Sequence, residues 1–182
     1  MAEDHHLVFG TLTDFMTGEA LDDTYDERDR QSLGRLLVET LGFAREEVAP
    51  RVPVFLRNEG GSALVVVDYA VSLGGKIAMI VRYGPGSVVS RERPALAASR
   101  LVAEHQVPVV VVTNTRDASV LMGPSGKRIG EGMEAIPGRD GLARIVEEMD
   151  EPFLKVDDRR KELERRILYT FEAVGACNCD DC

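Results

Sequence analysis

The stretch LVVVDYAVSLGGKIAMIVRYGPG, residues 64–86, decides the fold. Gly74 and Gly75 divide it into two apolar segments of strand length, and a Gly-Gly pair between such segments is typical of a β-hairpin. The uninterrupted valines at 65–67 predict a strand that is covered on both faces. Asp68 is the one carboxylate within this stretch. It is therefore the first candidate for a functional group.

The sequence around this hairpin predicts an α/β domain with a mixed central sheet flanked by helices. Apolar residues three and four positions apart predict a helix over 26–41, and Pro50 and Pro53 confine 48–56 to an edge strand. A strand-helix-strand order between 76 and 113 implies a crossover connection. The remaining expected strands are 63–71, 76–82, 107–113 and 119–122, and the remaining expected helices are 94–105, 142–149 and 157–174.

Three stretches, in this order, resemble the N-terminal domain of type I restriction enzyme R subunits. The first is MTGEALDDTYDERDRQSLGRLLVETLGF (16–43), the second is the hairpin, and the third is VPVVVVTNTRDASVLMGPSGKRIGEG (107–132). The likeness extends from about residue 16 to residue 148. It implies a restriction-endonuclease-like fold of the PD-(D/E)xK type, in which a strand Asp and a Glu-x-Lys on the next strand surround Mg²⁺.

The resemblance assigns the residues of a remnant catalytic site. It places the first-helix Glu on Glu27, the strand Asp on Asp68, and the Glu-x-Lys on residues 81–83, which here read Val-Arg-Tyr. A valine offers no oxygen to Mg²⁺, which requires oxygen ligands in octahedral geometry. Glu92 is the nearby carboxylate that could replace the lost ligand. The alternatives are that Glu27 complements the dipole of its helix, and that Asp68 bonds a backbone amide or an arginine.

The charge balance bears on DNA binding. The chain has 31 acidic and 22 basic side chains and a net charge of −9, which repels a phosphate backbone unless basic residues gather on one face. Arg82, Arg91 and Arg93 lie on or just after the candidate site strand, and they are the candidate DNA-binding residues. The alternative is that these arginines pair with acidic neighbours on a solvated surface.

All three cysteines, Cys177, Cys179 and Cys182, lie within the last six residues. A C-x-C-x-x-C cluster can hold Zn²⁺ through thiolates if a fourth ligand is supplied. The alternative is a tail that carries free thiols and no metal.

Length and composition predict one well-buried domain, with 44% hydrophobic residues among 182. We divide the chain into an N-terminal arm (1–25), a nuclease-like domain (26–150), a C-terminal helix (151–176) and a cysteine tail (177–182). No apolar run is long enough to span a bilayer, and the first residues lack the order of a signal peptide. We therefore expect a cytoplasmic protein without a membrane partner.

Three hypotheses for the function follow. The first is a stand-alone domain with a degenerate site that binds DNA or a partner, such as a restriction-system subunit or a second copy of the chain. The second is an active Mg²⁺-dependent DNA endonuclease that uses Glu27, Asp68 and Glu92. The third is a metal-sensing or redox-sensing module that uses the C-terminal cysteines.

Overall fold

The structure is a computed structural model, and it describes residues 7–58 and 61–172. In this part of the chain, six strands form one sheet in the order in which they occur in the sequence. The pairing of β5 with β6 is parallel and every other pairing in this sheet is antiparallel, which confirms the predicted mixed sheet. The strands are β3 (Val48–Asn58), β4 (Gly61–Leu73), β5 (Lys76–Tyr83), β6 (Val109–Thr113), β7 (Ala118–Met122) and β8 (Arg128–Glu131).

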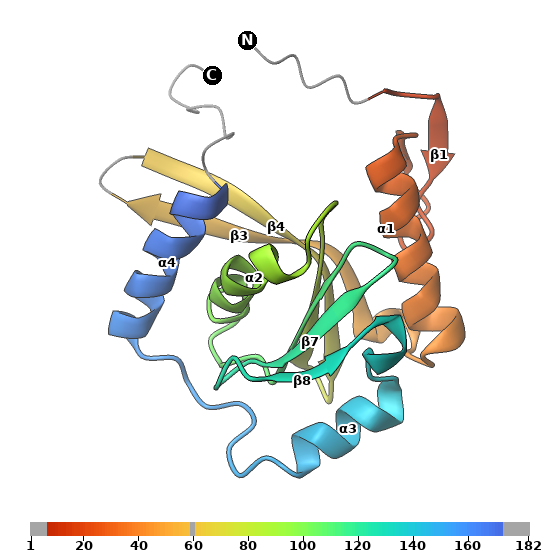
Figure 1. The fold of residues 1–182 in the computed structure, drawn as a ribbon. Helices are drawn as coiled ribbons and strands as arrows, with labels where there is room; N and C mark the ends of the chain where they lie inside the picture. Colours follow the sequence, from red (N-terminus) through yellow and green to blue (C-terminus); the bar gives the residue numbers. More distant parts are fainter. Residues whose placement is uncertain (1–6, 59–60, 173–182) are drawn as a thin grey trace.

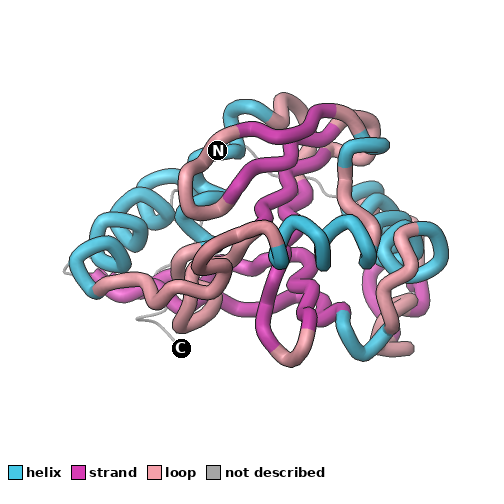
Figure 2. Tube along the Cα trace, turned by 90° about the horizontal axis from the view of Figure 1, so that it is seen from below, coloured by secondary structure: helices cyan, strands magenta, loops and turns pink. Residues whose placement is uncertain are grey.

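Helices cover both faces of the sheet (Figures 1 and 2). Helices α2 and α4 pack on one face and touch each other, whereas α1 and α3 pack on the opposite face. The α-helices are α1 (Tyr25–Arg35), α2 (Glu92–Ser99), α3 (Arg139–Glu147) and α4 (Asp158–Glu172). The π-helical turn η1 (Leu36–Thr40) continues α1, and the short 3-10 turns are η2 (Arg45–Glu47), η3 (Val89–Arg91) and η4 (Met133–Ala135).

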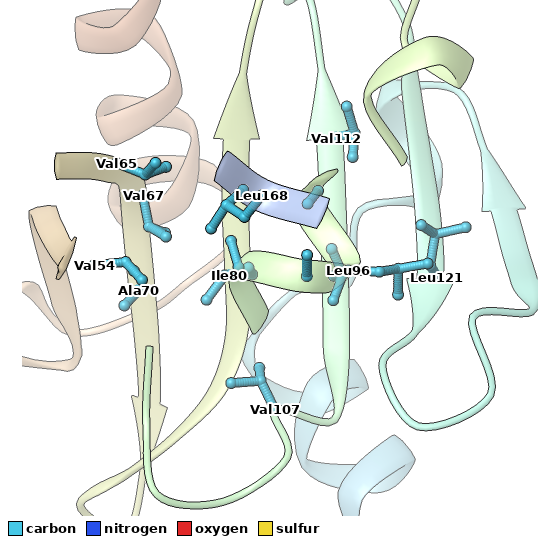
Figure 3. Close-up of a cluster of buried hydrophobic side chains, with 14 of the residues drawn as sticks. Val54, Val65, Val67, Ala70, Ile80, Leu96, Val107, Val112, Leu121 and Leu168 are labelled. Atoms are coloured by element: carbon cyan, nitrogen blue, oxygen red, sulfur yellow. The ribbon is translucent and has the colours of Figure 1, made fainter. Parts of the chain in front are cut away.

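The alternation of side chains along the central strands separates two apolar cores. Ile80 joins the core beneath α2 and α4, and its neighbour Val81 joins the core beneath α1 and α3. Figure 3 shows Ile80 and Val112 of the sheet beside Leu96 of α2 and Leu168 of α4. All five residues of β6 are buried, since β6 has a strand on each side and a helical layer on each face. The predicted central strand is therefore confirmed.

The hairpin of β3 and β4 turns over at Asp68. Val67 belongs to the core beneath α4, but Tyr69, two residues later, belongs to the core beneath α1. In a regular strand, residues two apart share a face, so the strand rotates at this point. On β3, the edge strand that the prolines predicted, Pro50 pairs with Tyr69 and Val52 pairs with Val67. Arg51 lies between these pairs and has a positive φ of 51°. We call the part of the hairpin between Asp68 and its tip, which begins at Val52 on β3 and at Val67 on β4, the outer half of the hairpin. This outer half is turned relative to the rest of the sheet.

Two segments differ from the predictions. The helix expected over 94–105 ends at Ser99, because the backbone N–H groups of Arg100 and Leu101 bond carbonyls three residues back and close the last turn. Within the segment expected to be an N-terminal arm (1–25), β1 (Thr11–Thr13) and β2 (Ala20–Asp22) form a small hairpin. Strands of three residues are too short to show a periodic pattern. Within the described residues, no helix is long and apolar enough to cross a membrane.

Candidate functional site

A cleft of about 430 Å³ lies where β4 separates from β5. The pairing of these strands ends at Tyr69 and Val81, so the next residues of each strand are free to turn toward other groups. Elements that are distant in the sequence meet here, because α1, β3 and the end of α4 all reach this fork. The charged residues that line the cleft are Glu27, Arg30, Arg51, Asp68, Arg82, Arg91 and Glu172.

Asp68 fills the fork between the two strands. Its Oδ2 accepts a hydrogen bond from the backbone N–H of Tyr83 at 2.8 Å, and its Oδ1 accepts one from Nε of Arg30 at 2.7 Å. The Nε of Arg82 lies 3.9 Å from Oδ2. Both oxygens of a buried carboxylate are therefore engaged by donors from the protein itself.

Glu27 lies in the first turn of α1, where Thr24 caps the helix by accepting a hydrogen bond from the Glu27 backbone N–H. Its Oε1 accepts hydrogen bonds from Arg51 at 2.6 Å and from Gln31 at 2.7 Å. Arg30 lies 3.8 Å from its Oε2. Glu27 thus lies in the first turn of α1, as expected for a carboxylate that complements the helix dipole, and it is also paired with cationic side chains.

Asp14 is a third carboxylate of this region, and it was not among the residues predicted from the sequence. It is 2% exposed, and it accepts hydrogen bonds from Arg51 at 2.5 Å and from Gln31 at 3.2 Å. Burial works to raise the pKa of Asp14, but hydrogen bonds from the Thr17 backbone and from Arg51 outweigh burial and hold the pKa below its ordinary value. The carboxylate is therefore charged at neutral pH.

Acidic and basic side chains alternate through the region. We call this chain of residues the cleft network; its members, in order of contact, are Asp14, Arg51, Glu27, Arg30, Asp68, Arg82 and Glu172. The signal for Arg51 was present in the sequence as a cation between two prolines on an apolar strand. No local pattern marked Arg30 or Asp14, because their partners are far away in the sequence.

The positions that the resemblance assigned to Glu-x-Lys carry different chemistry. Val81 is buried in the core beneath α1. The hydroxyl of Tyr83 lies 2.8 Å from a carboxylate oxygen of Asp29, to which it donates, and the guanidinium of Arg30 lies over its ring. Burial, and then the hydrogen bond to Asp29, raise the pKa of Tyr83 well above its ordinary value. Its hydroxyl therefore stays protonated and uncharged at neutral pH.

These residues do not fit the Mg²⁺ ion that the resemblance implies. Magnesium is typically bound through one or two carboxylates and completes its octahedron with water, yet both oxygens of Asp68 already accept hydrogen bonds from the protein and Val81 has no side-chain oxygen. Among the described residues, no group of three or more Asp, Glu, His or Cys could hold a metal ion.

The structure brings some of the predicted residues together and places others elsewhere. Glu27, Asp68, Arg82 and Arg91 line the cleft. Glu92 does not line it and is paired with Arg128 at 2.6 Å. Arg93 is paired with Glu164 at 2.6 Å, and the predicted ligands Cys177, Cys179 and Cys182 lie outside the described residues.

Arg91 reaches the cleft because Gly84 leaves room for it. A Cβ atom on Gly84 would lie 2.6 Å from Nε of Arg91, so a larger residue there would displace the guanidinium. Arg91 also donates to the carbonyl of Pro85 at 3.1 Å. The turn after β5 is therefore shaped around an arginine.

The fold and the cleft define the class of protein: an α/β domain whose central hairpin fork holds ion-paired acidic residues. A model of the family described as "Type I restriction enzyme R protein N terminus" matches residues 25–137, which is more than half of the chain. The chain belongs to this family, as the motifs predicted. A search of curated proteins and a search of solved structures each gave no match. The matched segment contains most of the cleft network, but α3 and α4 follow it in the chain.

Proposed function

We propose that this chain is a catalytically inactive, restriction-endonuclease-like domain that binds a partner protein, such as a subunit of a restriction system. The observation that carries the proposal is the state of Asp68, whose two oxygens are held by Arg30 and by the Tyr83 backbone. A metal ion or a water nucleophile at this carboxylate would therefore have to compete with the Arg30 guanidinium and with the Tyr83 backbone N–H.

The neighbouring residues support the loss of catalysis. Phosphodiester cleavage by a metal-dependent nuclease needs a group that stabilises the charge developing on the phosphate. The resemblance places a lysine for this role on Tyr83, which is uncharged and bound to Asp29. Arg82 is a cation near this position, but it is paired with Glu172 at 3.1 Å.

An exposed apolar surface supports a protein partner. Phe55 and Leu64 are cross-strand neighbours on the outer half of the β3–β4 hairpin, and they are 76% and 53% exposed. Val66 extends this surface to the cleft, which Leu64 and Val66 also line. Aromatic and aliphatic groups gathered next to a charged rim are typical of protein interaction sites. We favour a protein over DNA because carboxylates neutralise several of the cleft arginines and the net charge is −9.

The loss of catalysis is tested by calorimetric titration of Mg²⁺ and Mn²⁺ into the wild-type protein and Asp68→Ala, together with DNA cleavage assays. We expect neither metal binding nor cleavage in the wild-type protein. Metal-dependent cleavage that disappears in Asp68→Ala would overturn the proposal and restore the endonuclease hypothesis.

Partner binding is tested with purified subunits of a type I restriction enzyme and with a DNA duplex as competing ligands. We expect Phe55→Ser to weaken subunit binding at least tenfold, and Leu163→Ser, an exposed leucine of α4, to leave it unchanged. DNA binding that falls steeply with salt and is indifferent to Phe55→Ser would replace the protein partner by DNA.

A further inference from the structure

We infer that the cleft binds the carboxylate of an acidic side chain from the partner protein, at the guanidinium of Arg91 and next to Arg82. The inference rests on the proposed function, because it specifies the chemistry of the partner that the cleft receives. Leu64 and Val66 line the same cleft and are 53% and 39% exposed. The partner segment would therefore carry apolar side chains beside its acid.

Arg91 is a cation of the cleft without an acidic partner. The other arginines that line the cleft, Arg30, Arg51 and Arg82, are each ion-paired with a carboxylate. In the part of the chain that the structure describes, Arg91 makes no ion pair, and its hydrogen bond goes from Nη2 to the Pro85 carbonyl at 3.1 Å. The residue is nevertheless half-buried. A guanidinium that is partly withdrawn from water without a counter-charge favours an anionic ligand.

Gly84 provides the space that places the Arg91 guanidinium beside Arg82. Gly84 continues β5, since its backbone N–H donates to the carbonyl of Thr113 on β6 at 3.0 Å. Side chains two residues apart on a strand share a face, so a side chain on Gly84 would lie next to that of Arg82. The Arg91 guanidinium fills this position, because a Cβ atom on Gly84 would lie 2.6 Å from its Nε and 2.7 Å from its Cζ. Two arginine side chains from separate elements thus lie on one face of the sheet.

Arg82 has hydrogen-bonding capacity that its own partners do not use. Its side chain is 12% exposed, and its Nη2 donates to Glu172 at 3.1 Å. Its Nε and Nη1 are enclosed and have no hydrogen-bond acceptor within residues 7–58 and 61–172, since Asp68 lies 3.9 Å from Nε. Enclosed donors without an acceptor are costly. A carboxylate bound at Arg91 would bring additional negative charge to this guanidinium.

The acidic residues of the cleft favour a carboxylate over a phosphate. Glu27, Asp68 and Glu172 line the same cleft, and they repel a doubly charged phosphate more strongly than a singly charged group. A planar guanidinium matches a carboxylate, with which it forms two parallel hydrogen bonds. DNA would bring several phosphates to a chain of net charge −9. An aspartate or glutamate side chain of a protein is therefore the favoured ligand.

The test is a titration with two matched peptides, followed by NMR. One probe is the peptide Leu-Glu-Phe with both ends capped, and the other is Leu-Gln-Phe, which differs from it only in the charged group. We expect the wild-type protein to bind the glutamate peptide about tenfold more tightly, because hydrogen bonds to a charged group are stronger than those to a neutral amide. The methyl resonances of Leu64 and Val66 should shift during the titration. Equal affinities for the two peptides, or binding of neither, would overturn the inference.

Variants of the chain locate the binding group. Arg91→Gln should remove the preference for the glutamate peptide. Gly84→Ala should remove it as well, although it keeps Arg91, because the atoms nearest to the added methyl group are those of the Arg91 side chain. The matched control is Arg144→Gln, which changes an exposed arginine of α3 on the opposite face of the sheet and should keep the preference. A preference that survives in folded Arg91→Gln or folded Gly84→Ala would contradict the inference.

Binding of restriction subunits and of DNA separates the inference from the proposed function. Subunit binding that weakens in both Phe55→Ser and Arg91→Gln would support both. Subunit binding that weakens in Phe55→Ser but not in Arg91→Gln would support a protein partner and overturn the inference. DNA binding that falls steeply with salt and weakens in Arg91→Gln would overturn both, because the ligand of Arg91 would then be a phosphate.

Discussion

Two ion-pair networks of this domain are built in opposite ways. In the cleft network, acids and arginines alternate, and most carboxylates have more than one donor. In the second network, the fully buried Glu164 of α4 is bound by Arg93 at 2.6 Å, Arg100 at 2.9 Å and Arg160 at 2.6 Å. We call these four residues the Glu164 cluster. The first network lines an open cleft, and the second fixes α4 to α2.

The two networks differ in how many charged groups a single substitution would leave without a partner. The loss of one member of the cleft network leaves its neighbours with other partners or with access to water. The loss of Glu164 leaves several guanidinium groups together, and Arg100 among them is buried. Burial, together with the nearby Arg160 and Arg93, already lowers the pKa of Arg100 against the effect of Glu164. The comparison therefore predicts that the Glu164 cluster is the more fragile of the two.

The largest effect is expected for Glu164→Gln. Removing one partner of a buried ion pair typically costs about 3–5 kcal/mol, because the remaining charge is buried without compensation. Urea denaturation measures the loss in the free energy of unfolding. The matched control is Glu162→Gln, a half-exposed acid of the same helix, which should change stability far less. Equal effects for both variants would show that α4 is held by its apolar contacts alone.

A smaller effect is expected for Asp68→Asn in the cleft network. An asparagine can accept only one of the two hydrogen bonds from Arg30 and Tyr83, and its NH₂ group faces a donor on the other side. The loss should be about 1–3 kcal/mol, the cost of an unsatisfied buried group. The same denaturation experiment measures it. A loss larger than that of Glu164→Gln would reverse the comparison.

The pH dependence of stability distinguishes Asp14 within the cleft network. Its pKa is lower in the folded than in the unfolded chain, so its charged form stabilises the fold above the unfolded pKa of about 3.9. This stabilisation is lost as the pH falls through the folded pKa. The stability difference between wild type and Asp14→Asn should thus be constant near neutral pH and shrink below about pH 4. A difference that does not change with pH would mean that Asp14 acts through its shape alone.

The smallest effect is expected for Thr24→Ala at the start of α1. The Thr24 hydroxyl accepts a hydrogen bond from the Glu27 backbone at 3.1 Å, and the loss of such a cap costs about 1 kcal/mol. Thr24→Ser retains the hydroxyl and should retain the stability. Thermal melts of the two variants provide the check. Equal melting temperatures for Thr24→Ala and Thr24→Ser would show that the Thr24 hydroxyl does not stabilise the start of α1.

The sequence was sufficient for the parts of the fold that depend on apolar patterns. The valine runs predicted β4 and β6, the two prolines predicted that β3 is an edge strand, and leucine spacing predicted α1. β8 was not predicted, because the four residues Arg128–Glu131 carry little apolar pattern.

The candidate site was predictable only in part. The motifs led to Asp68 and Glu27, which the structure brings to one cleft. The burial of Asp14 and the conformation of Arg51 depend on contacts between residues 37 positions apart, and no local pattern records such contacts. The pairing of Glu92 with Arg128 depends in the same way on a strand that the sequence did not reveal.

The turning over of the β3–β4 hairpin at Asp68 has a consequence for how members of this family can vary. Between Asp68 and the tip of the hairpin, β4 is not paired with β5. The length of this part of the hairpin is therefore independent of the rest of the sheet. Each residue added to both strands would lengthen it by about 3.4 Å and turn the new side chains to the opposite face. Insertions in steps of two residues per strand would therefore enlarge the surface around Phe55 and leave the central sheet unchanged.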